Sequence, residues 1–134
     1  VKIYNSLKKG GTLLLETQAF DAIKTIGNSG PSWYFSEKGL FSDKPHISLK
    51  ENFWCETTRT TTERFFIIET ESGSVTRYAS TTQAYTEKEY SAMLSSAGFI
   101  KIKRHPSMTE TGESSLTTPG GVSENILEII SAVK

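Results

Sequence analysis

The chain contains a single cysteine and no long hydrophobic run. The lone Cys55 excludes an intrachain disulfide framework and is compatible with a reducing, cytoplasmic setting. No apolar run approaches the roughly 20 residues that a membrane-spanning helix needs, and the N-terminal residues do not resemble a signal peptide. Acidic and basic residues balance at 15 each, so net charge favours neither nucleic acid nor a membrane as a partner.

The strongest signal near the N-terminus lies in residues 10–16 of a 134-residue chain, which is long enough for one domain. A short helical pattern precedes it, and Gly10 and Gly11 end that pattern because glycine reaches positive φ without steric cost. Three consecutive leucines follow, a run typical of a parallel strand covered on both faces. Glu16 comes where this strand should end, and in open α/β sheets that end faces the ligand crevice.

After a short helical stripe over residues 19–26, the chain changes to the two-residue period of β-strands. The change is clear from His46 onward, where the residues alternate between two faces as far as Trp54. Further extended runs cover residues 58–69 and 75–84, and a turn joins them. Three adjacent strands with short links predict an antiparallel β meander.

A capping box marks the next helix. Thr86 is the expected N-cap and Glu89 its partner at N3, the helix runs to Ala97, and Gly98 closes it. Residues 100–103 then form a predicted strand.

The C-terminal residues are less regular. Residues 105–123 are rich in Ser, Thr, Gly and Pro, which predicts a mobile loop that a protease would cut first. Residues 124–133 suit either a helix capped by Ser123 or, because of their β-branched content, a strand.

Residues 7–16, Leu-Lys-Lys-Gly-Gly-Thr-Leu-Leu-Leu-Glu, resemble the fifth-strand motif of class I S-adenosylmethionine-dependent methyltransferases. In that family a helix, a sixth strand and a last strand follow, and the last strand runs antiparallel between the fifth and sixth. Residues 86–97, 100–103 and 125–133 match this order, and the Ala-Gly-Phe step at residues 97–99 is common at the entry to the sixth strand. The resemblance therefore favours the strand for the last segment.

A further resemblance narrows the family to one bacterial and archaeal subgroup with a β insertion after the fifth strand. It rests on Trp33-Tyr34 and on residues 39–46, 51–54 and 83–86.

The resemblance covers nearly the whole chain but only the C-terminal half of the family's fold. It implies an α+β fragment of an α/β fold, in which an antiparallel β meander accompanies the C-terminal strands of a class I methyltransferase sheet and two to three helices. Residues 1–27 would hold a helix, the fifth strand and a short helix, residues 28–85 the β meander insertion, and residues 86–134 the capped helix and the last two strands.

The sequence contains no Gly-x-Gly, so the glycine-rich loop that lets a backbone approach the cofactor is missing. The resemblance therefore implies S-adenosylmethionine as the cofactor of a longer parent protein and none bound by this chain alone. The chain begins at Val1 within a helical pattern, which also leads us to expect a piece of a longer protein. The acceptor is expected to be a small molecule.

Six residues are candidates for binding the substrate: Glu16, Trp33, Tyr34, His46, Phe53 and Trp54. The carboxylate at the strand end could orient a substrate or simply lie at the surface. The four aromatic residues could wall a pocket or form the core of the meander. The histidine titrates in the range of a general base, but it follows a proline directly and equally suits a structural role.

Other reactive side chains carry less information. Cys55 has no Cys/His motif around it, so an inert thiol is expected, and His105 has no partner at a metal-ligand spacing, so no metal is expected. Lys101, Lys103 and Arg104 could bind phosphate or form the solvated side of an edge strand.

Two functions remain open on the sequence alone. The first is a partial methyltransferase whose meander forms one wall of the acceptor pocket, and the second is a self-contained α+β small-ligand-binding or interaction module without catalysis. In the first, the missing fourth strand leaves one edge of residues 12–16 bare, and the leucines there do not discourage pairing. We therefore expect a homodimer or a swapped dimer.

Overall fold

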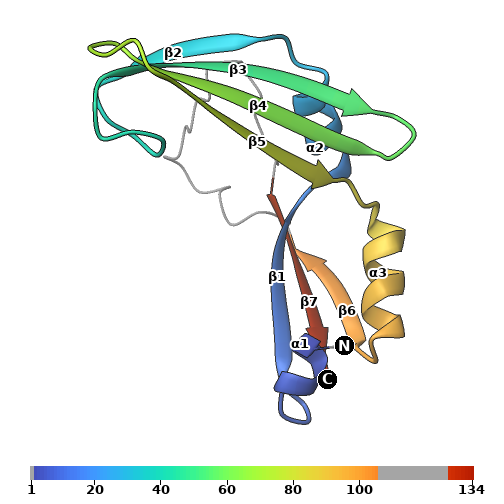
Figure 1. The fold of residues 1–134 in the computed structure, drawn as a ribbon. Coiled ribbons are helices and arrows are strands. Elements are labelled where there is room, and N and C mark those ends of the chain that lie inside the picture. Colours follow the sequence, from blue (N-terminus) through green and yellow to red (C-terminus); the bar gives the residue numbers. More distant parts are fainter. Residues whose placement is uncertain (1, 106–126) are drawn as a thin grey trace. The chain divides into compact units, whose positions relative to one another are not determined.

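The structure, a computed structural model, describes residues 2–105 and 127–134 (Figure 1). These residues divide into two compact units. The first unit holds residues 2–22, 84–105 and 127–134, and the second holds residues 23–83. Apart from His105, the expected mobile loop lies outside the described residues.

The first unit contains two helices and three strands: α1 (Lys2–Ser6), β1 (Thr12–Gln18), α3 (Glu87–Ser96), β6 (Ile100–His105) and β7 (Leu127–Val133). Its sheet has the order β1-β7-β6, and β7 runs antiparallel to both neighbours. This is the order expected for the last strand, and the helical alternative for this segment is wrong over Leu127–Val133.

The core of the first unit lies between this sheet and α3 (Figure 1). Its buried members are Leu94, Phe99, Ile130 and Ala132. The ring of Tyr4 packs edge-on against Phe99, with 5.1 Å between the ring centroids. α1 therefore takes part in the same core.

The leucine run of β1 is packed on one face only. Leu13 and Leu15 pack against the core, but Leu14 on the other face is 70% exposed. Every strand pairing among the described residues is antiparallel, and in that part of the chain the second edge of β1 carries no strand. In the described part of the chain, β1 therefore has the bare edge and the exposed leucine that are expected when the rest of the sheet is missing.

The predicted capping box at the start of α3 is present. The Glu89 N–H donates to Thr86 Oγ1 at 3.4 Å, and the Thr86 N–H donates to Glu89 Oε2 at 2.8 Å. The rings of Tyr85 and Tyr90 lie 5.6 Å apart at the flanking positions, where a hydrophobic staple fixes the entry angle of the chain.

Thr86→Ala should destabilise the protein by about 1 kcal/mol, because it removes the side-chain acceptor from the first turn of α3. Thr86→Ser keeps that acceptor and serves as the control. Chemical denaturation followed by circular dichroism measures both variants. Equal midpoints for the alanine variant and the parent would contradict the contribution of the cap.

The second unit is a β meander with a helix at one end (Figure 1). Its strands are β2 (Ser32–Ser36), β3 (His46–Cys55), β4 (Thr60–Glu69) and β5 (Val75–Gln83), in the order β2-β3-β4-β5. The helix α2 (Phe20–Gly27) begins in the first unit and ends in the second. The meander therefore has one more strand than expected, because β2 spans only 5 residues and its aromatic sequence shows no clear period.

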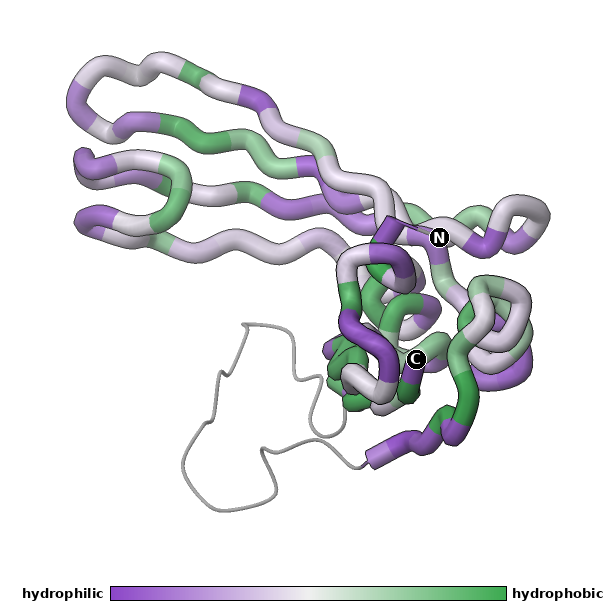
Figure 2. The backbone as a smooth tube through the Cα atoms, turned by 90° about the horizontal axis from the view of Figure 1, so that it is seen from below, coloured by the Kyte–Doolittle hydropathy of each residue, from purple (hydrophilic) through white to green (hydrophobic). Residues whose placement is uncertain are grey.

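The strand register divides the meander into two faces, because directly opposed residues share a face. The "groove face" carries alternate residues that include Trp33, Phe35, Leu49, Glu51, Phe53 and Phe66. The "helix face" carries the residues between them, which include Tyr34, His46, Ser48, Lys50, Asn52 and Trp54. Figure 2 shows the corresponding changes between hydrophobic and hydrophilic residues along these strands.

The helix α2 packs on the helix face. Thr61 Oγ1 donates to the Ile23 carbonyl oxygen at 2.6 Å, and both residues are buried. Gly27 comes so close to Trp54 that a Cβ there would lie 2.9 Å from the Trp54 Cβ. Close approach of the helix to the sheet thus depends on glycine at this position.

Candidate functional site

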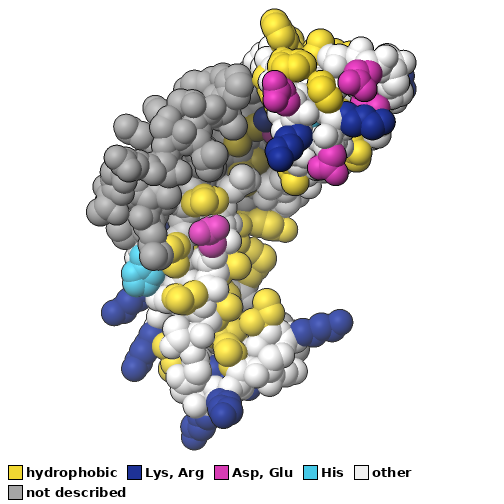
Figure 3. Space-filling view, turned by 90° about the vertical axis from the view of Figure 1, so that its left-hand side faces the viewer, with side chains coloured by type: hydrophobic (Ala, Val, Ile, Leu, Met, Phe, Trp, Pro, Cys, Tyr) yellow, Lys and Arg dark blue, Asp and Glu magenta, His cyan; other side chains and the backbone are white. Residues whose placement is uncertain are grey.

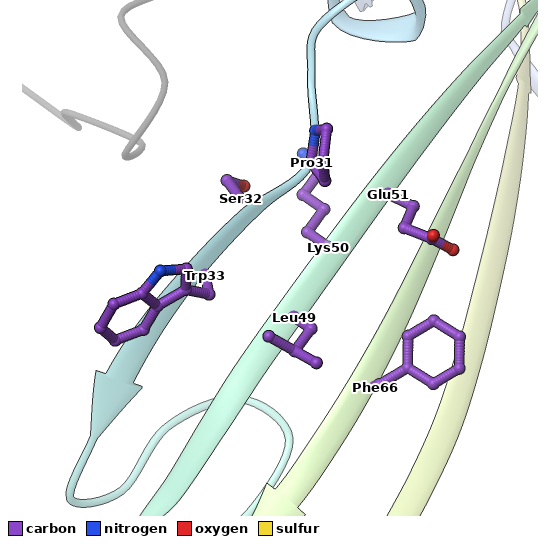
Figure 4. A pocket seen from close by; sticks show the side chains of 7 residues that line it. All are labelled: Pro31, Ser32, Trp33, Leu49, Lys50, Glu51 and Phe66. Atoms are coloured by element: carbon purple, nitrogen blue, oxygen red, sulfur yellow. The ribbon is translucent and has the colours of Figure 1, made fainter.

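A groove opens on the groove face of the meander and lies wholly within the second unit (Figure 4). It encloses about 390 Å³ and is lined by Pro31, Ser32, Trp33, Leu49, Lys50, Glu51 and Phe66. That volume falls within the usual range of about 300–1,000 Å³ for small-molecule sites.

The floor of the groove is apolar. Leu49 lies opposite Trp33 on one side and opposite Phe66 on the other, so the three side chains form a row across β2, β3 and β4 (Figure 4). Trp33 is 66% exposed, which leaves its ring open to a contact from outside the chain. A row of apolar side chains such as this can contact an apolar or aromatic surface of a ligand or of another protein.

The charges beside the groove are already paired within the chain. Arg64 lies 3.2 Å from Glu51, and its guanidinium stacks over the Phe53 ring at 4.3 Å. Lys50 pairs with Glu63 at 2.5 Å. The groove therefore presents aromatic carbon rather than an excess of either charge.

The helix face has a different chemistry. His46 is buried, and its Nδ1 lies 2.7 Å from the Lys44 carbonyl oxygen. Because a carbonyl oxygen only accepts, Nδ1 donates in this bond. Tyr34 lies on the same face, directly opposite Ser48. The face thus combines a phenol, an imidazole and a hydroxyl.

Two buried oxygens on the helix face lack a hydrogen-bond partner in the structure as described. They are Ser48 Oγ and Asn52 Oδ1, although Asn52 Nδ2 donates to Ser29 Oγ at 2.8 Å. Buried polar atoms are nearly always satisfied, by water or a ligand where the protein offers no partner. Neither residue was predicted from the sequence, in which the two-residue period that places them beside His46 was the only available signal.

The six sequence candidates fall on three different surfaces. Trp33 and Phe53 lie on the groove face, and only the first lines the groove. Tyr34, His46 and Trp54 lie on the helix face. The remaining candidate, Glu16, is exposed on β1 in the first unit, opposite Ile129 of β7.

Trp54 has a structural environment. Its Nε1 donates to Glu56 Oε2 at 2.5 Å. This bond and one from Lys24 lower the pKa of Glu56. With Gly27 packed on its Cβ, the residue anchors α2 to the sheet.

The other side chains singled out in the sequence do not form a site in the described part of the chain. Arg104 forms ion pairs with Glu87 and Glu128, so it does not belong to a free basic patch with Lys101 and Lys103. Among the described residues, no group of three or more His, Cys, Asp or Glu could hold a metal ion.

Cys55 is exposed, and hydrogen bonds from the Thr58 hydroxyl and N–H lower its pKa. His105 Nε2 lies 2.7 Å from Ser131 Oγ.

No helix in the described ranges is long and apolar enough to cross a membrane.

Comparison with solved structures places the fold among known proteins. The chain is similar to a crystal structure of an S-adenosylmethionine-dependent methyltransferase from Clostridium acetobutylicum ATCC 824, with a TM-score of 0.66 and 10% sequence identity. The match covers 98% of this chain and 47% of the other, so the chain spans about half the length of that protein. No protein-family model matches the chain, and no curated protein matches its sequence. At this identity the likeness shows a methyltransferase-like fold.

Proposed function

We propose that this chain is the C-terminal part of a cytoplasmic class I S-adenosylmethionine-dependent methyltransferase with a small-molecule acceptor, and that it forms a homodimer or a swapped dimer. The observation that carries the proposal is the position of β7, antiparallel between β1 and β6. The motif in residues 7–16 and the likeness to the clostridial methyltransferase support the same assignment.

In this proposal the helix face of the meander forms the substrate-side wall. Small-molecule sites place a few polar groups at an otherwise apolar surface. Tyr34, which is half-buried, supplies such a group, and on the same face the buried Ser48 Oγ and Asn52 Oδ1 lack a hydrogen-bond partner in the structure as described.

We infer that this chain alone does not hold the cofactor. Its sequence contains no Gly-x-Gly, the motif that lets a backbone approach the cofactor. A longer protein would therefore have to supply the cofactor loop, and this piece would be inactive alone.

The isolated chain should show no one-site binding of S-adenosylmethionine tighter than millimolar, because it lacks an organised cofactor loop. Calorimetric titration measures this directly, with an intact methyltransferase as the control for the cofactor. Tighter one-site binding would exceed roughly −4 kcal/mol, which needs an organised site, and would contradict the proposal.

The second candidate function is a self-contained α+β module that binds a small apolar ligand. The observation that favours it is the groove itself, because every residue that lines it belongs to the second unit. This function requires nothing from a longer protein. It also requires the groove to stay open to the ligand, and a second protein chain on the groove face would therefore exclude it.

A further inference from the structure

The groove face of the meander exposes large apolar side chains. Trp33 is 66% exposed there, Phe35 54% and Val75 53%. On the helix face, Ile67 is 2% exposed, and His46 and Ser48 are 1% and 0% exposed. The helix face is therefore the packed side of the sheet, and the exposed apolar groove face calls for a cover.

Two adjacent rows of groove-face side chains, all apolar except Arg77, cross the sheet. The first row consists of Phe35, Ile47, Ile68 and Val75, one from each strand. The second consists of Trp33, Leu49, Phe66 and Arg77, again one from each strand. Contiguous apolar patches of several hundred Å² on a surface mark interaction sites.

We propose that a second copy of this chain covers the groove face. The twofold axis would lie between the two sheets, parallel to the strands and above the gap between β3 and β4. Two β-sheets pack face to face about 10 Å apart with their strands nearly aligned. Rotation about this axis lays β3 over β4 of the second copy and β2 over β5. Each row then meets the same row of the other copy.

The contacts that this symmetry creates are complementary. In the second row, Leu49 meets Phe66 of the second copy, and Trp33 meets Arg77, where a guanidinium over an indole gains a cation–π interaction. In the first row, Phe35 meets Val75 of the second copy and Ile47 meets Ile68, so every contact is apolar.

The charged residues agree with the same axis. Glu51 and Arg64 lie opposite each other on β3 and β4, one on each side of the axis. Each would meet the opposite charge of the second copy, so two pairs would become a network of four charges. An interface of this kind is isologous, as twofold symmetry requires.

Other partners fit this face less well. The face carries one acidic and two basic residues, Glu51, Arg64 and Arg77, and the first two are paired. A nucleic acid or an anionic membrane would require a basic surface. Figure 3 shows acidic, basic and hydrophobic side chains near one another at the top of its view.

The size of the face predicts a weak dimer. Three strands about 30 Å long and one about 17 Å long, about 4.8 Å apart, give a flat area of roughly 510 Å² per copy. A standard interface buries about 800 Å² per partner. We therefore expect dissociation in the micromolar range. The inference rests on the proposed function only in that both include a homodimer. A monomer in sedimentation would contradict the interface, whereas tight cofactor binding by the isolated chain would contradict the proposed function, so the two failures are distinguishable.

Sedimentation equilibrium over a range of micromolar concentrations tests the interface. Leu49→Lys places a charge in the second row and should weaken dimerisation at least tenfold. Ser80→Lys adds the same charge at an exposed position opposite Glu63, on the helix face, and should leave the dimer unchanged. Leu14→Lys alters the exposed face of β1 and separates pairing through that strand from pairing through the groove face.

A charge exchange keeps the test decisive if the lysine variant does not fold. Glu51→Arg sets like charges together and should weaken the dimer, whereas Glu51→Arg combined with Arg64→Glu should restore it. A monomeric parent chain at the highest concentration would overturn the proposal. So would a dimer that is lost with Leu14→Lys but kept with both Leu49→Lys and Glu51→Arg.

Discussion

Gly27→Ala should destabilise the second unit by about 2–4 kcal/mol. A Cβ at this position would lie 2.9 Å from the Trp54 Cβ and 3.1 Å from the Trp54 Cα, and it would overlap Thr61 Oγ1. Adding a methyl group to a packed contact costs about 1–3 kcal/mol. Displacing the Thr61 hydroxyl would also weaken its bond to the Ile23 carbonyl oxygen, for about a further 1 kcal/mol.

Tryptophan fluorescence during urea unfolding measures this effect, because Trp33 and Trp54 both lie in the second unit. Gly30→Ala is the matched control, since no described atom lies within 4 Å of a Cβ at that position. Its effect should stay within about 1 kcal/mol and could be stabilising. If the two variants unfolded at the same urea concentration, close packing of α2 on the helix face would be contradicted.

Ile130→Ala should destabilise the first unit by about 2–5 kcal/mol, the usual cost of truncating a buried isoleucine to alanine. Ile130 is 1% exposed and lies in the core with Leu94 and Phe99. It lies on β7, the central strand of the β1-β7-β6 sheet. The cavity left by the substitution would therefore lie beside the strand with which both β1 and β6 pair.

Circular dichroism during chemical denaturation follows this variant, and Ile100→Ala controls for the loss of methyl groups alone. Ile100 is 57% exposed on β6, so its truncation should cost well under half as much. Equal losses at the two positions would mean that β7 does not form the centre of this core.

The features of the fold that depend on neighbouring residues were predictable from the sequence. The capping box at Thr86 and Glu89 needs only a spacing of three residues, and both of its hydrogen bonds are present. The meander follows from the two-residue period after His46. The position of β7 came from the resemblance to a family rather than from the period, because its apolar spacing suits a helix whereas its β-branched content suits a strand.

The features that depend on distant residues were not predictable in the same way. An unbroken leucine run reads as buried on both faces, but Leu14 is exposed because the described layers pack on one side of its sheet. Trp33 and Tyr34 were grouped as one candidate wall although adjacent residues of a strand point to opposite faces. The lack of a partner for Ser48 Oγ depends on the register of β2 and β4 against β3, which the sequence does not specify.

The coding sequence upstream of Val1 is the one measurement that tests the central proposal most directly. The account predicts an open reading frame that continues upstream and encodes a strand followed by a glycine-rich turn, the part that would hold S-adenosylmethionine. A natural start codon at Val1, with no such segment joined to the chain, would contradict the proposal and leave the self-contained binding module.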